Sequence, residues 1–209
     1  MTASLGCAES SVGYFVDSSA GNDASDGKTP ATAWKSLTKA NAVTLKPGDH
    51  LCLRAGSSWT GQLKPQGSGS SAAPVVIDKY GAGEKPRISA GTTDKDAVSL
   101  VNFAYVELNN LEVSNKKSAL GDYRGISVVG RDAGTLNHVQ IRGCFVHDVT
   151  GEVNWIGGDV ADNATGVTFQ TGWDASKRTG GIVCEVATTA AQPFKTMFNY
   201  VLIGGKFGQ

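Results

Sequence analysis

The chain has 209 residues, of which 40% are apolar, so it is long enough to bury one hydrophobic core. Lysine plus arginine and aspartate plus glutamate number 19 each, which leaves no net charge to attract nucleic acid or an anionic membrane. No run approaches the roughly 20 consecutive apolar residues that span a bilayer, and the N-terminus lacks the apolar centre of a signal peptide. These features predict a soluble domain with no nucleic-acid or membrane partner.

The abundance of glycine, 27 residues, and the scarcity of helix-favouring runs predict an all-β fold with many tight turns. Residues 1–13 are expected to form a disordered or processed tail, and a first strand is predicted at Tyr14 to Val16. A loop rich in Gly, Asn, Asp and Pro follows over residues 18–32.

One helix is predicted after this loop. Trp34, Leu37, Ala40 and Val43 recur at three-residue steps, the spacing of one helical face, with Thr32 as the expected N-cap. Beyond this segment the chain shows only strand and turn patterns.

An internal repeat is the most informative pattern. The segment YVELNNLEVSN from Tyr105 aligns with HVQIRGCFVHD from His138 and with YVLIGGKFGQ from Tyr200, and each alignment keeps one constant offset along its length. The second offset is nearly twice the first, which suits a loop inserted within one coil. Fixed offsets between strand pairs predict stacked coils of a solenoid. The last row places Lys206 and Gly208 where the first row has apolar residues, and the chain then stops.

Two further features support stacked coils. Apolar residues alternate in AVSLV, GISVV and GIVCEV, as they do on strands with one inward face. The centre of each row of the first repeat holds a pair of residues: Asn109 and Asn110 in the first row, Arg142 and Gly143 in the second, and Gly204 and Gly205 in the last. Because Asn and Gly adopt left-handed backbone angles at low cost, a bend is predicted there.

The segments YFVDSSAGNDASDGKTPATAWKSLTKANAVTLKPGDHLCLRAGSSWTGQL and APVVIDKYGAGEKPRISAG resemble the opening of right-handed parallel β-helix proteins of the pectate-lyase-like superfamily. The resemblance implies a right-handed parallel β-helix with a short N-terminal capping helix and an extended groove for a polysaccharide. We expect few coils, the last one cut short. The expected parts are an N-terminal cap (14–60), first coils (61–146), a loop insertion (147–180) and a last partial coil (181–209).

The insertion is the predicted site, because excursions from β-helix coils shape the substrate groove. Two carboxylates are required for glycoside hydrolysis, one as acid and one as base or nucleophile. The candidates that the insertion offers are Asp148, Glu152, Asp159, Asp162 and Asp174. For any single one of them a role as a solvated turn former is the simpler alternative.

A lyase is the second possible chemistry. In the resembling polysaccharide lyases a basic residue removes the proton beside a uronate carboxylate, which makes Lys177 and Arg178 candidates, and Ca²⁺ stabilises the anion. Asp159 and Asp162 are the candidate Ca²⁺ ligands, the only cofactor expected. Solvated loop charges are the alternative for the basic pair.

Trp155 and Trp173 are candidate platforms for sugar rings, with a role in a small loop core as the equal alternative. The catalytic strings of the polygalacturonases (NTD, GHG, RIK) and of the pectate lyases (WIDH) are missing, so neither catalytic set transfers. The function predicted is a secreted or periplasmic carbohydrate-active enzyme that cleaves glycosidic bonds in a polysaccharide, a hydrolase slightly ahead of a lyase. The alternatives are a glycan-binding or assembly module, or an inactive fragment of a longer enzyme. The open final coil predicts one of two arrangements, an N-terminal fragment of a longer protein or a homo-oligomer that packs through the open end.

Other residues are predicted to be structural. The four cysteines, Cys7, Cys52, Cys144 and Cys184, show no C-x-x-C spacing and are expected to be buried free thiols rather than a disulfide or metal site. The three histidines, His50, His138 and His147, stand singly and are expected to be structural. The oxygen-bearing loop residues Asp17, Asn22, Asp23 and Asp26 are expected to form turns, with Ca²⁺ binding as the alternative.

Overall fold

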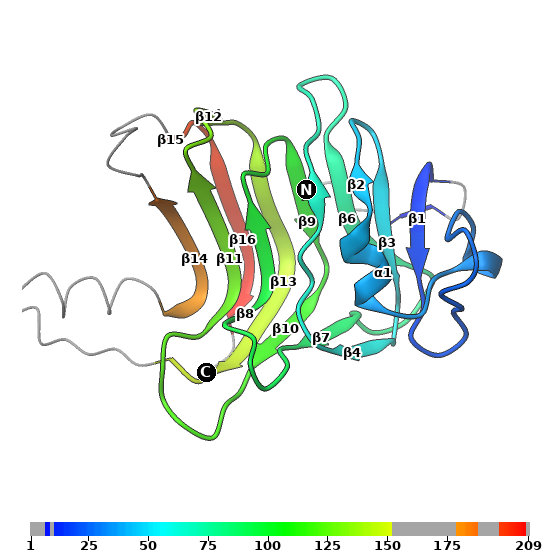
Figure 1. Cartoon of the computed structure of the whole chain (residues 1–209), viewed down its shortest axis with the longest axis horizontal. Coiled ribbons are helices and arrows are strands. Elements are labelled where there is room, and N and C mark those ends of the chain that lie inside the picture. The colour runs from blue at the N-terminus through cyan, green and yellow to red at the C-terminus, as the bar shows by residue number, and fades with distance from the viewer. Residues whose placement is uncertain (1–6, 9–10, 152–178, 188–196, 208–209) are drawn as a thin grey trace, which may run out of the picture.

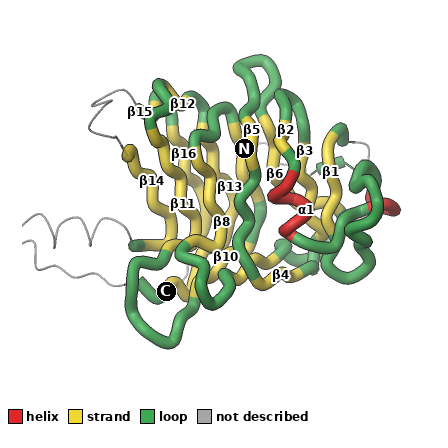
Figure 2. Tube along the Cα trace, viewed as in Figure 1, coloured by secondary structure: helices red, strands yellow, loops and turns green. Residues whose placement is uncertain are grey.

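The computed structural model describes residues 7–8, 11–151, 179–187 and 197–207. Its strands run parallel to their neighbours and stack along the long axis (Figure 1), with loops at the corners (Figure 2). Each sheet takes its successive strands from successive passes of the chain, so the chain winds in coils. The first sheet contains β1 (Gly13–Val16), β3 (His50–Arg54), β6 (Val75–Tyr80), β9 (Val106–Asn109), the first half of β13 (Val139–Val149) and the first half of β16 (Val201–Phe207).

Two further sheets complete each coil. The second contains β4 (Ser58–Thr60), β7 (Arg87–Ser89), β10 (Glu112–Asn115) and the second halves of β13 and β16. The third contains β8 (Asp96–Val101), β11 (Arg124–Arg131) and β14 (Gly180–Ala187). Two short pairs lie at a corner: β2 (Thr44–Leu45) with β5 (Gln66–Gly67), and β12 (Thr135–Leu136) with β15 (Met197–Phe198).

The repeat predicted from the sequence is the coil. Ile141 pairs with Leu108 on one side and with Ile203 on the other, which are the partners that the alignment of the three rows predicts. In the third sheet Ile126 pairs with Val98 and with Ile182, as the second series predicted. The stacked parallel strands are therefore confirmed, whereas the right hand of the coil stays a prediction.

The predicted bend is confirmed in two coils and corrected in the last. Asn110 (φ 57°) and Gly143 (φ 61°) adopt left-handed angles at the junction of the first and second sheets, but Gly204 does not. The register between β13 and β16 shifts here, because β13 has one more residue than β16 at the bend. Lys206 therefore pairs with Phe145 and Phe207 with Val146, so the predicted placement of Lys206 in an apolar position is wrong, and Gly208 lies outside the described residues.

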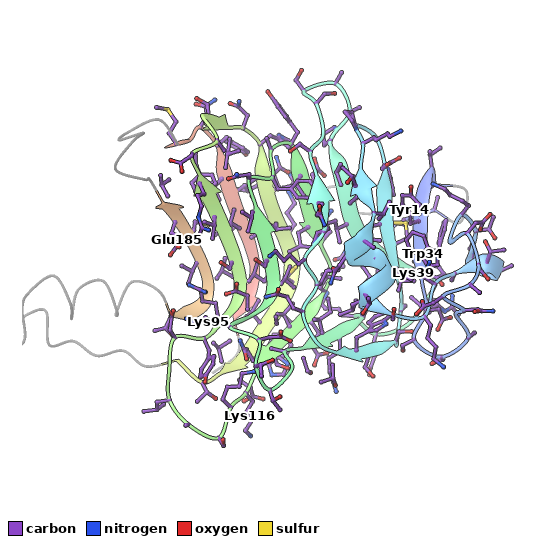
Figure 3. The ribbon with its side chains drawn as sticks, viewed as in Figure 1. Tyr14, Trp34, Lys39, Lys95, Lys116 and Glu185 are labelled. Atoms are coloured by element: carbon purple, nitrogen blue, oxygen red, sulfur yellow. A yellow bond between two sulfur atoms is a disulfide. The ribbon has the colours of Figure 1, made fainter. Side chains whose placement is uncertain are left out.

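The N-terminal cap contains the predicted helix in shorter form. Helix α1 (Leu37–Ala42) begins after Ser36, whose side chain accepts a hydrogen bond from the Lys39 backbone, so the predicted cap at Thr32 is wrong. Thr32 instead ends a 3-10 turn, η1 (Pro30–Thr32). Trp34 lies before the helix and stacks on Tyr14 with ring centroids 4.8 Å apart (Figure 3). No helix in the described part of the chain is long and apolar enough to cross a membrane.

The expectation of four free thiols is wrong for one pair. Cys7 and Cys52 form a disulfide, because Cys7 pairs with the end of β6 through a parallel bridge to Tyr80, and Cys52 lies on the neighbouring strand β3. Sequence spacing cannot show this proximity, since 45 residues separate the two cysteines. Cys144 is free and buried as predicted, and Cys184 is free but exposed.

Candidate functional site

The outer face of the second sheet presents polar and aromatic side chains next to the predicted insertion. Val113 and Val146 point inward and are buried, so the residues that alternate with them point outward. Glu112 therefore stands beside Phe145, its partner in register, and His147 lies two residues further along β13. Parallel pairing thus gathers on one surface residues that come from neighbouring coils.

His147 lies between two carboxylates. Its Nε2 is 3.1 Å from Oε1 of Glu112, and its Nδ1 is 3.1 Å from Oδ2 of Asp148. Oε1 of Glu112 also accepts a hydrogen bond of 2.7 Å from Nε of Arg87, its neighbour on β7. We call these four residues, Arg87, Glu112, His147 and Asp148, the outer-face cluster.

An open groove with a volume of about 810 Å³ adjoins the outer-face cluster. Phe145 lies in its wall, and its ring stacks on that of His147 with centroids 4.6 Å apart. An aromatic wall beside charged groups is suited to a sugar, which has apolar C–H faces and polar hydroxyl edges. The groove is lined by Glu84, Lys85, Arg87, Glu112, Gly143, Cys144 and Phe145.

The two carboxylates of the cluster differ in exposure. The Glu112 side chain is 14% exposed and holds two hydrogen-bond partners, whereas the Asp148 side chain is 56% exposed. Asp148 has a φ of 49° and is the extra residue of a bulge in β13, since His147 pairs with Ser114 and Val149 pairs with Asn115. Two carboxylates in unlike surroundings are what acid and base roles require.

Asp148 is the one predicted catalytic residue that the structure describes, and it lies in this cluster. The other predicted site residues lie outside the described residues: Glu152, Trp155, Asp159, Asp162, Trp173, Asp174, Lys177 and Arg178. Their roles therefore stay predictions.

The loop residues proposed as turn formers are turn formers. Oδ1 of Asp17 accepts from the backbone of Ser19 and Ala20, and the other three side chains also accept backbone N–H groups nearby or across the cap. Since these oxygens bind the chain itself, Ca²⁺ binding is not needed to explain them.

Sequence reasoning missed Arg87 and Glu112, and it treated His147 as structural. The repeat in the sequence already related these residues. Glu112 is next to Val113 and His147 is next to Val146, and these two inward valines occupy the same position in aligned rows. The outward positions of the aligned rows, compared across coils, would have brought them together. His138 makes a similar pair with Glu107 at 3.0 Å, but on the first sheet and away from the groove lining.

The stacked parallel strands define the chain as a solenoid, and the groove lies on the outer face of its second sheet. Comparison with solved structures places the fold among such proteins: a GH136 lacto-N-biosidase from Eubacterium ramulus matches 93% of this chain with a TM-score of 0.70 and 23% identity. At that identity the likeness shows the fold alone. No family model matches the chain.

Two curated relatives are also glycosidases by name. A lacto-N-biosidase from Bifidobacterium longum subsp. longum is 25% identical over 193 residues, which cover 67% of this chain and 12% of the relative. An alpha-1,3-galactosidase A from Akkermansia muciniphila is 31% identical over 116 residues, 51% of this chain and 19% of the relative. The homologues are thus glycoside hydrolases, and the chain spans less than a fifth of the curated relatives and 34% of the solved structure.

Proposed function

We propose that this chain is part of a glycoside hydrolase that cleaves a glycosidic bond in a glycan held along the second sheet. The observation that carries the proposal is the similarity of this chain to glycosidases. Two glycosidases resemble it in sequence, and a solved lacto-N-biosidase resembles it in fold. The outer-face cluster supports it, because Glu112 lines a groove with an aromatic wall and His147 links it to a second carboxylate, Asp148.

Glu112 and Asp148 are the proposed acid and base. The reaction needs one carboxyl group to protonate the leaving oxygen and one carboxylate to activate water or attack the sugar. His147 orients both carboxylates, since its Nε2 lies within hydrogen-bond distance of Glu112 and its Nδ1 within hydrogen-bond distance of Asp148. Arg87 holds Glu112 from the other side, which fixes the direction of its carboxylate.

The insertion completes the proposed site. Asp148 lies four residues before Glu152, so the predicted carboxylates and the two tryptophans begin where the cluster ends. We propose that the insertion forms the second wall of the groove, with Ca²⁺ at Asp159 and Asp162 as part of the same proposal. Secretion or export to the periplasm is proposed as well, because a glycan-cleaving enzyme must meet its substrate.

Assays of the purified chain test this proposal. The first substrates are chromogenic lacto-N-biosides and α-1,3-galactosides, with an acidic polysaccharide as the test for elimination. Hydrolysis releases the chromophore or new reducing ends, whereas elimination leaves an unsaturated uronide that absorbs ultraviolet light. Turnover of a neutral glycoside supports the proposal, and an ultraviolet-absorbing product, or no turnover of any of them, contradicts it for this chain.

A glycan-binding module is the second candidate, favoured by the Phe145 and His147 ring pair at the edge of the groove. It predicts that the chain is retained on immobilised glycan without releasing sugar. Phe145→Ala should then lower retention, whereas Phe198→Ala, on the short strand β15, should not. Retention with no turnover would favour this candidate over the hydrolase.

A further inference from the structure

A second cluster of reactive side chains lies on the outer face of the first sheet, at β3. His50 and Cys52 are two residues apart on this strand, so both point outward, opposite to the inward Leu51 and Leu53. Cys7 reaches the same face on the N-terminal segment. The two sulfur atoms and one ring nitrogen of His50 all lie within 4.8 Å of one another.

His50 carries an unsatisfied polar atom. Its Nδ1 is buried and has no hydrogen-bond partner among the described residues. A buried nitrogen without a partner costs free energy, and a ligand would recover it. An imidazole nitrogen is also a common ligand of metal ions in proteins.

The charges around His50 favour a cation. Three acidic residues, Asp78, Asp49 and Glu107, lie close enough to act on the imidazole electrostatically. Asp78 is the register partner of Cys52 on β6 and is almost fully buried, so its negative charge stands beside the cluster. A divalent ion placed among the three donors would be attracted by these carboxylates.

We propose that Cys7, His50 and Cys52 form a Zn²⁺-type site when the disulfide is reduced. A phosphine supplies the two electrons and becomes a phosphine oxide with oxygen from water, the sulfur–sulfur bond breaks, and the two hydrogens of that water give two thiols. Zn²⁺ then binds two thiolates and one imidazole nitrogen and releases both thiol protons to solvent. The fourth position is left for water, as in zinc sites with three protein ligands.

The geometry suits this ion. Zinc binds sulfur at about 2.3 Å and nitrogen at about 2.0–2.1 Å, so tetrahedral ligand atoms lie roughly 3.5 Å apart. The spread of at most 4.8 Å in the structure requires little movement of the strands. Oxidation of the pair to the disulfide removes both thiolates, and the site is then lost.

Zinc retention by the full chain tests the proposal. The chain is reduced with a phosphine, freed of reductant without air, loaded with Zn²⁺ and desalted, and bound zinc is measured with a chromophoric chelator. We expect about one zinc per reduced chain and none in the oxidised chain. His50→Gln should weaken retention by about tenfold or more, since even the loss of a group one step from the metal costs about 10- to 100-fold. Cys184→Ser, which removes an exposed free thiol, should retain zinc like the parent.

A melting experiment separates a native site from zinc bound by an unfolded chain. Zinc at the folded site raises the Tm of the reduced chain, whereas binding to unfolded thiols lowers it. A Co²⁺-loaded chain should also absorb in the near ultraviolet through its thiolates. The proposal is overturned if the reduced chain retains no zinc, if its Tm falls with zinc, or if His50→Gln retains zinc as well as the parent does.

Discussion

At the scale of single residues, one imidazole organises the outer-face cluster. His147 bridges Glu112 from the preceding coil and Asp148 from its own strand, and the ring of Phe145 covers one of its faces. Each member alone is an ordinary surface residue. Their meeting depends on the pairing of Glu112 with Phe145 in parallel register, which sets the two coils at a fixed offset.

The first prediction concerns these carboxylates and tests the proposed hydrolase. Glu112→Gln and Asp148→Asn should each lower kcat by about 10²- to 10⁴-fold, because an amide neither donates nor accepts the proton in the reaction. Release of a chromogenic sugar by the purified chain measures this. Glu107→Gln is the matched control, since Glu107 pairs with His138 at 3.0 Å but does not line the groove. Equal losses in all three variants would argue against a catalytic role.

The second prediction concerns Cys144. Burial raises the pKa of its thiol to about 11, whereas an exposed thiol ionises near pH 9. Between pH 9 and 11 the Cys144 thiol therefore stays protonated in the folded state but ionises in the unfolded state. This difference favours unfolding, so the free energy of unfolding falls as the pH rises from 9 to 11. The loss is on the order of 2 kcal/mol by pH 11. Urea unfolding at pH 8 and pH 10.5 measures it, and Cys144→Ala should show a smaller decrease between the two pH values. An equal decrease would contradict the assignment to this thiol.

At the scale of elements, the bend at the junction of the first and second sheets sets the direction of the second sheet, whose outer face carries the groove. Asn110 and Gly143 hold the left-handed angles in neighbouring coils, and the Asn110 amide donates to Oδ1 of Asp78 on β6 at 2.9 Å. The bend is thus tied to the coil that precedes it. Strand β13 continues through the bend, so Phe145 lines the groove and His147 stacks on it from the same face.

The third prediction tests this bend. Gly143→Ala should destabilise the chain by about 1–2 kcal/mol, because the residue has φ 61° and an added Cβ would lie 2.6 Å from Oδ1 of Asn110. Gly134→Ala is the control, since Gly134 has φ 70° but nothing within 4 Å of the added Cβ. Thermal or urea unfolding should therefore show the larger loss for Gly143→Ala. A larger loss for Gly134→Ala would mean that the contact with Asn110 does not matter.

The N-terminal segment is held to the outer face of β3 by a small apolar cluster and the disulfide. Phe15 and Tyr80 meet edge to face at 5.1 Å, and Cys7, Ala33 and Cys52 complete the cluster. This covering layer buries the outward side of strands whose other side already lies in the main core. It explains why Cys52 is fully buried although it points away from the coil interior.

The fourth prediction concerns that disulfide. Cys7→Ser should lower the free energy of unfolding by about 2–4 kcal/mol, because the bond closes a loop between cysteines 45 residues apart. Urea unfolding in the presence of a metal chelator measures the loss without any contribution from bound ions. Cys184→Ser should leave stability within about 0.5 kcal/mol of the parent. Treatment of the Cys7→Ser variant with a reductant should not lower its free energy of unfolding further. A further decrease would show that the reductant breaks another bond.

At the scale of the whole molecule, the coils form columns of inward side chains that run along the long axis. Leu108 and Ile141 are fully buried in one column, whereas Ile203, next in register, is 41% exposed. Leu202 and Val186 are also exposed on the last described strands, and Glu185 lies at the opposite end of the molecule from Tyr14 (Figure 3). The described part thus presents apolar surface at one end.

The fifth prediction follows from that end. The purified chain should self-associate as its concentration rises, because burying the exposed column removes apolar surface from water. Sedimentation velocity or light scattering measures this, and Ile203→Glu should shift the distribution toward monomer. Val12→Glu is the control, since Val12 is 75% exposed near the other end of the chain. A monomer at all concentrations would contradict the predicted homo-oligomer.

Much of the fold could be predicted from the sequence, because a coil repeats its own pattern. The rows from Tyr105 and His138 show the offset that the paired strands use, and the bend was visible in Asn110 and Gly143. The helix was located but not bounded, since Ser36 is an equally good N-cap and only packing of Leu37 and Ala40 fixes the first turn. The candidate site was found only at Asp148, because its other members come from neighbouring coils.

The sequence by itself determined that the chain coils, since alternating apolar residues at a fixed offset can bury their inner faces only by stacking. The tertiary structure alone decided which outward residues meet. Glu112 reaches His147, and Cys7 reaches Cys52 and His50, through contacts between segments about 35 to 45 residues apart. The physical reason is that inward positions repeat a common apolar type, whereas outward positions are free to differ, so their partners are fixed only once the register of the strands is set.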